Sequence, residues 1–77
     1  MITGAQIREA RELLGWRPSQ LANKVGAQVF SINRAEAGQR TLIDFDRVER
    51  CLKTVGIKFG DDGSVMLRDF GERREAG

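Results

Sequence analysis

The side chains best suited to specific recognition lie in the segment 28–37. If this segment is a helix with its apolar residues inside, its outward face carries side chains spaced three and four residues apart. These are Val29, Phe30, Asn33 and Arg34, with Gln28 at the start of the segment. An arginine can donate two hydrogen bonds to a guanine, and an asparagine can reach a base edge or a phosphate. Apolar side chains can contact a thymine methyl group, so the pattern favours reading of DNA base edges.

The distribution of charge singles out the same part of the chain, although the net charge is only +2. Between residues 15 and 40 the cations are Arg17, Lys24, Arg34 and Arg40, and the acid is Glu36. After residue 60 the acids Asp61, Asp62, Asp69, Glu72 and Glu75 outnumber the arginines Arg68, Arg73 and Arg74. A basic middle followed by an acidic end predicts that nucleic acid is bound between residues 15 and 40.

Catalytic and metal-binding chemistry has few candidate residues. The chain has no histidine and a single cysteine, Cys51. Histidine is the commonest general base and metal ligand, and one cysteine alone makes neither a zinc site nor a Cys–His pair. We therefore expect no enzyme, no metal and no cofactor. No signal peptide and no apolar run of about 20 residues is found, so we expect a cytoplasmic protein without a membrane partner.

Start and stop signals predict three helices in the first half of the chain. Thr3 and Gln6 have capping-box spacing, and Gly15 ends the helix whose apolar stripe is Ile7, Ala10, Leu13 and Leu14. A second helix is expected to begin at Pro18, because proline is favoured at the first position of a helix, and to end at Gly26. Its apolar face consists of Leu21, Ala22 and Val25. The third helix has Ile32, Ala35 and Glu36 inside and ends at Gly38. Two short helices joined through a glycine form the helix-turn-helix pattern.

The second half predicts one more helix and then strands. A fourth helix is expected over about residues 42–55, with Thr41 as its N-cap and Gly56 at its end. The negative charge of Asp44 stabilises the positive N-terminal end of the helix dipole. Its inward residues are Phe45, Val48, Leu52 and Val55. The apolar period then changes to two, at Ile57 and Phe59 and again at Val65 and Leu67, around the turn 60–63. This alternation predicts a β-hairpin.

The stretch 7–38 resembles the helix-turn-helix family of Cro and the phage repressors, also called the xenobiotic response element family. The resemblance is carried by Ile7, Arg8, Ala10, Arg11, Leu13, Leu14, Gly15, Trp16, Leu21, Ala22, Gly26, Ser31, Ile32, Arg34, Glu36 and Gly38. It implies base contacts from Gln28, Val29, Phe30, Asn33 and Arg34, and phosphate contacts from Arg17, Ser19, Lys24 and Arg40. It also implies a half-buried ion pair between Arg11 and Glu36. Two departures alter the contacts: apolar Val29 and Phe30 replace the usual polar residues, and Arg17-Pro18 replaces Ser-Gln.

We therefore expect a mainly α fold, a four- to five-helix repressor-like domain with a short C-terminal β-hairpin or strand. The helix-turn-helix domain is expected over 1–56, a hairpin for dimerisation over 57–70, and a flexible tail over 71–77. A lone hairpin is marginal in water. Its apolar side chains, Ile57, Phe59, Val65 and Leu67, are therefore expected to form the dimer interface. In the alternative, the hairpin folds back onto its own helices and the chain dimerises only on DNA.

The functional hypothesis is a sequence-specific transcriptional regulator, namely a repressor that binds a palindromic operator as a homodimer. One short helix reads too few base pairs to find a site alone. The expected partners of the protein are double-stranded DNA and a second copy of the chain. The protein is expected in the cytoplasm, of bacterial or phage origin, in association with the nucleoid. So small a domain leaves little room for an effector pocket, and we expect none. Two alternatives stay open: a protein-binding module, such as an antitoxin or antiactivator that uses Val29 and Phe30, or an architectural protein that assists recombination.

Overall fold

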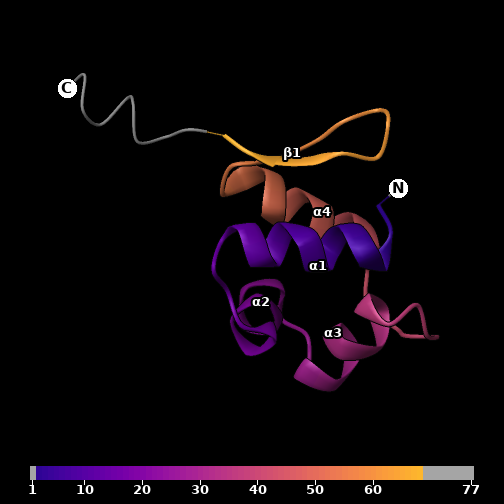
Figure 1. Cartoon of the computed structure of the whole chain (residues 1–77). Coiled ribbons are helices and arrows are strands. Elements are labelled where there is room, and N and C mark those ends of the chain that lie inside the picture. The colour runs from indigo at the N-terminus through magenta and orange to yellow at the C-terminus, as the bar shows by residue number, and fades with distance from the viewer. Residues whose placement is uncertain (1, 69–77) are drawn as a thin grey trace.

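Four helices and a two-stranded hairpin follow one another along residues 2–68, the part of the chain that the computed structural model describes (Figure 1). The elements are α1 (Gly4–Leu13), α2 (Pro18–Val25), α3 (Val29–Glu36), α4 (Phe45–Thr54), β1 (Ile57–Phe59) and β2 (Val65–Leu67). This confirms the expected mainly helical fold with a C-terminal hairpin. The expected tail, 71–77, lies outside the described residues, as do residues 69–70 of the expected extension. No helix in the described part is long and apolar enough to cross a membrane.

The start of α1 is fixed by the predicted capping box. The Thr3 backbone N–H donates to the Gln6 side-chain oxygen at 2.9 Å, and the Gln6 backbone N–H donates to the Thr3 hydroxyl at 3.2 Å. These two bonds satisfy N–H groups that have no partner within the helix. Ile7 and Ala10 are buried, as the stripe requires, but Leu13 is exposed. The prediction for Leu13 was wrong because the helix ends there and that side of its last turn is not covered.

The start of α4 differs from the prediction. The Asp44 carboxylate accepts from the backbone N–H groups of Asp46 and Arg47 at 3.0 and 3.2 Å, so Asp44 is the N-cap and the helix begins at Phe45. The hydroxyl of Thr41, the expected cap, instead donates to the Ser31 carbonyl at 3.1 Å. Residues 37–44 therefore form a loop that is tied back to α3.

The hairpin packs on the helices of its own chain. β1 and β2 are antiparallel, with Ile57 opposite Leu67 and Phe59 opposite Val65. Ile57 and Val65 are buried in the same cluster as the helical core, where β2 contacts α1 and β1 contacts α4 (Figure 1). The other members of this core are Ile2, Ile7, Ala10, Leu21, Ala22, Val25, Ile32, Val48 and Leu52. The helical core thus absorbs more of the hairpin than the sequence led us to expect.

Candidate nucleic-acid interface

The turn between α2 and α3 sets the angle at which the two helices meet. Gly26 ends α2 with φ +72°, a left-handed conformation that glycine adopts without strain. Ala22 is buried where the helices approach, and its carbonyl accepts from the Ala27 N–H at 2.8 Å. The arrangement leaves α3 at the rim of the molecule, on the side opposite the hairpin (Figure 1).

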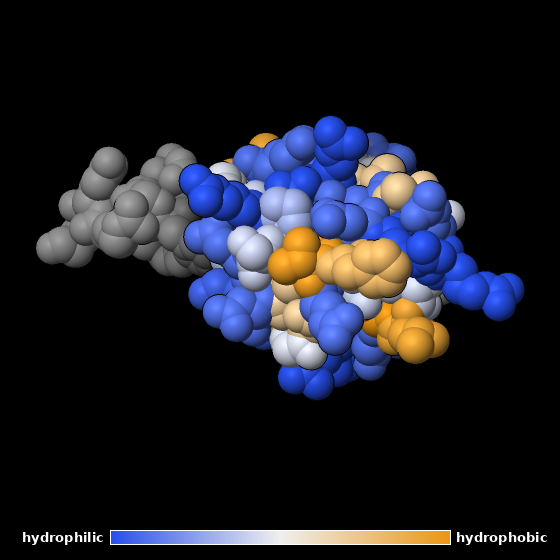
Figure 2. Space-filling view, turned by 90° about the horizontal axis from the view of Figure 1, so that it is seen from below, coloured by the Kyte–Doolittle hydropathy of each residue, from blue (hydrophilic) through white to orange (hydrophobic). Residues whose placement is uncertain are grey.

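The outward face of α3 is exposed and partly apolar. Ile32 and Ala35 are buried, whereas Val29, Phe30 and Asn33 are exposed, Phe30 with 65% of its surface. Figure 2 views the molecule from this side and shows apolar side chains near the middle of a largely hydrophilic face. Three of the expected base-reading residues, Val29, Phe30 and Asn33, are therefore exposed at the first two turns of the helix, and Gln28 is exposed just before it. Gln28 occupies the N-cap position but makes no side-chain capping hydrogen bond there.

Arg34, the fifth expected base reader, has a structural contact that the sequence did not reveal. Its Nε donates to the backbone carbonyl of Arg40 at 2.6 Å, and its guanidinium carbon lies 5.4 Å from the centre of the Phe30 ring. Arg34 therefore joins the outward face of α3 to the loop that follows it.

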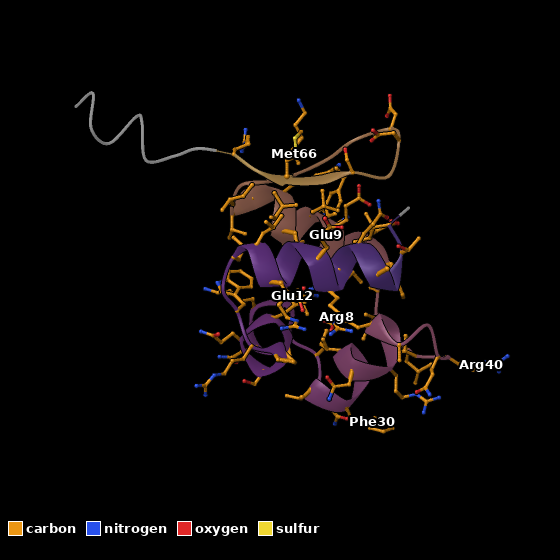
Figure 3. All side chains as sticks on the ribbon, in the orientation of Figure 1. Arg8, Glu9, Glu12, Phe30, Arg40 and Met66 are labelled. Carbon is orange, nitrogen blue, oxygen red and sulfur yellow. The ribbon has the colours of Figure 1, made fainter. Side chains whose placement is uncertain are left out.

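The expected phosphate-binding residues lie in three different places. Arg17 and Ser19 are exposed at the start of α2, where the Arg17 N–H donates to the Gln20 side-chain oxygen at 2.7 Å. Arg40 is exposed in the loop after α3, and Figure 3 shows its side chain pointing away from the molecule. Arg17 and Arg40 thus bring cations to the two ends of the α2–α3 unit.

Lys24 is directed toward the corner between α1 and α2. Its ammonium lies over the Trp16 ring, 5.3 Å from the ring centre. Burial raises the pKa of the Cys51 thiol on α4, and the charge of Lys24 opposes that rise. Lys24 is therefore near Trp16 and α4, and the structure does not place it beside the exposed face of α3.

Arg11 and Glu36 form the expected ion pair between α1 and α3. The two hydrogen bonds, from Nε and Nη2 of Arg11 to the carboxylate oxygens, measure 2.8 and 3.0 Å. Nη1 of Arg11 also donates to the Trp16 carbonyl at 2.8 Å. Only 12% of the Arg11 side chain and 9% of the Glu36 side chain are exposed, and the hydrogen bond to Glu36 raises the pKa of Arg11. This pair holds α3 and the α1–α2 turn to α1.

The sequence model of a family described as a helix-turn-helix domain matches residues 3–62, which span all four helices. The chain belongs to this family. The family is associated with Cro-like and xenobiotic-response-element proteins, so the chain is a DNA-binding regulator of the helix-turn-helix kind. No curated protein and no solved structure matches the chain significantly.

The helix-turn-helix unit also has a shallow groove whose full lining the sequence did not indicate. An open groove between α2 and α3 is lined by side chains that include Ser19, Gln20, Asn23, Gln28 and Val29. Gln20 and Asn23 were missed as candidates. The signal was present, since both lie on the side of α2 away from its buried residues Leu21 and Val25. Amides in such a groove can donate to phosphate oxygens or base edges.

Proposed function

We propose that this protein is a transcriptional repressor that binds a palindromic operator as a homodimer, with α3 of each copy in a major groove. The observation that carries the proposal is the exposed outer face of α3. It is accompanied by two exposed cations, Arg17 at the start of α2 and Arg40 in the loop after α3. A recognition helix reads base edges with the residues of its first turns while its neighbours contact the backbone. In this arrangement Gln28, Asn33 and Arg34 are the hydrogen-bonding readers.

The experiment that tests this function is selection of bound sequences from a random duplex pool. A homodimer is expected to enrich a palindrome whose half-sites are one helical turn apart, about 34 Å between centres. Retention of no sequence above the level of the starting pool would refute the function.

Neutralising the phosphate-binding cations is expected to weaken binding to all duplexes about equally. Arg17→Gln and Arg40→Gln should each flatten the slope of log affinity against log salt by about one unit, because each variant neutralises one phosphate fewer. Lys24→Gln should change the slope less, because its ammonium lies over Trp16. The matched control is Lys58→Gln, since Lys58 is an exposed cation on β1, far from α3. Wild-type slopes for both arginine variants would remove them from the interface.

Arg34→Ala is expected to weaken binding to the selected operator by about 1–3 kcal/mol, because it removes a base contact. Folding should be kept, since Arg34 is only half-buried and contributes no core atom. Arg34→Lys is the informative companion: it keeps the charge but loses the planar pair of donors. If the lysine variant discriminates operator from random duplex as well as wild type does, Arg34 contributes only charge.

The homodimer is proposed to use the parts of the hairpin that the core leaves uncovered. Ile57 and Val65 are buried within the chain, whereas Leu67 is exposed and Phe59 is half-buried. Each strand of the two-stranded sheet also has one edge without a neighbouring strand in the described part of the chain, which a second copy could pair with. These features favour contact through the edges and ends of the hairpin.

Leu67→Glu is expected to raise the dissociation constant of the dimer at least tenfold, since it brings a charge into an apolar contact. Sedimentation over a range of protein concentrations measures the effect. Met66→Glu is the matched control, because Met66 is exposed on the opposite face of β2. Unchanged association of the Leu67 variant would contradict this interface.

A second candidate function, binding of a protein partner, is favoured by the apolar surface itself. Leu42 in the loop after α3 is 98% exposed, in addition to Val29 and Phe30. Exposed apolar side chains of this kind often mark protein contacts. Salt separates the two functions, because affinity for DNA falls steeply as salt rises, whereas an apolar protein contact does not.

A further inference from the structure

Two apolar side chains stand at the start of α3, on the face that the proposed function turns toward the bases. Val29 and Phe30 are both exposed, and Phe30 points away from the body of the molecule (Figure 3). Neither side chain can hydrogen-bond a base. The apolar group that DNA presents in its major groove is the C5 methyl group of thymine. An apolar pair in this position therefore fits a pyrimidine that carries this methyl group.

Arg34 is held beside the Phe30 ring in a defined orientation. The hydrogen bond from Nε to the Arg40 carbonyl, 2.6 Å long, and the contact with the ring restrict the guanidinium on two sides. Within residues 2–68 the two terminal nitrogens of Arg34 have no hydrogen-bond partner. They are two parallel donors, the arrangement that matches O6 and N7 of guanine.

We propose that Phe30 and Arg34 act as one unit that reads a methyl-bearing pyrimidine close to a guanine; this specificity rests on the proposed function. The ring centre and the guanidinium carbon are 5.4 Å apart. Successive base pairs are stacked about 3.4 Å apart. The methyl group and the guanine therefore lie one or two base pairs from each other.

Two selections run in parallel test this specificity. One random duplex pool is synthesised with thymine and the other with uracil, which has the same hydrogen-bonding groups but lacks the methyl group. In the thymine pool the consensus is expected to contain a guanine with a thymine one or two base pairs away. In the uracil pool enrichment at that position should disappear. Affinity for the consensus duplex should fall about fourfold for each contacted methyl group that is replaced by hydrogen.

Variants assign the discrimination to Phe30. Phe30→Ala is expected to bind the thymine and uracil duplexes equally, and Phe30→Leu, which restores an apolar side chain, should recover part of the preference. Met66→Ala is the matched control, because Met66 is also exposed and apolar but lies on the opposite side of the molecule from Phe30 (Figure 3). It should keep the full preference for thymine.

The possible results separate this specificity from the function on which it rests. A shared consensus with equal enrichment in both pools refutes the methyl contact and leaves the DNA-binding function standing. A thymine preference that survives in Phe30→Ala refutes the role of Phe30. Enrichment in neither pool refutes sequence-specific binding itself and directs attention to a protein partner.

Discussion

Replacing Glu36 with alanine is expected to lower the free energy of unfolding by about 3 kcal/mol. The substitution leaves the Arg11 guanidinium in a site where about nine-tenths of its side chain is shielded from water. It also removes both hydrogen bonds that join α1 to α3. Removing one partner of a buried pair is costly, because the other charge stays buried without compensation. Denaturant unfolding followed by circular dichroism measures the loss.

Two further variants show whether this loss of stability comes from leaving a buried charge without its partner. Glu12→Ala breaks the exposed Arg8–Glu12 pair on α1, and it should cost less than about 1 kcal/mol because water screens that pair. The double variant Arg11→Met with Glu36→Leu should be more stable than Glu36→Ala alone, since neither charge is then stranded. An unfolding midpoint for Glu36→Ala equal to that of wild type would show that the pair contributes nothing to stability.

The parts of the fold that were predicted correctly depend on short-range signals. The capping box of Thr3 and Gln6 operates within one turn of α1, and Gly26 ends α2 through its own backbone angle. The start of α4 was misplaced because Thr41 and Asp44 are both suitable caps. Only the structure shows that the Thr41 hydroxyl is used by a carbonyl ten residues away, on α3.

The contacts that depend on distant residues were the ones the sequence could not provide. Alternation of apolar residues predicts the strands, but it does not say which surface covers them, and α1 and α4 cover Ile57 and Val65. The helical spacing of apolar residues in the sequence placed Arg34 on the outward face of α3. This spacing could not show the hydrogen bond from Arg34 to the Arg40 carbonyl, because that hydrogen bond depends on the path of an irregular loop.

Gly4→Ala is expected to destabilise the protein by about 1–3 kcal/mol or more, although alanine is the better helix former. A Cβ atom built on Gly4 would overlap the carbonyl oxygen of Ala35 and lie 2.8 Å from its carbonyl carbon. The obstacle is the backbone of α3, which cannot rotate away as a side chain can. Helix propensity alone would stabilise the variant by at most about 1 kcal/mol, the value for a helix interior, because Gly4 is the first residue of α1. The sign of the change therefore shows whether α1 and α3 are in this close contact.

The same variant should also weaken DNA binding, because relief of the overlap moves α3 relative to α1. Gly15→Ala, just beyond the other end of α1, is the matched control. Its Cβ would meet nothing within 4 Å, so its cost comes only from the backbone angle, φ +72°. That strain is about 1–2 kcal/mol and leaves α3 in place. The folded Gly15→Ala protein should therefore bind DNA with the affinity of wild type, whereas the folded Gly4→Ala protein should bind DNA more weakly. A Gly4→Ala protein more stable than wild type, with unchanged affinity, would rule out the close crossing of α1 and α3.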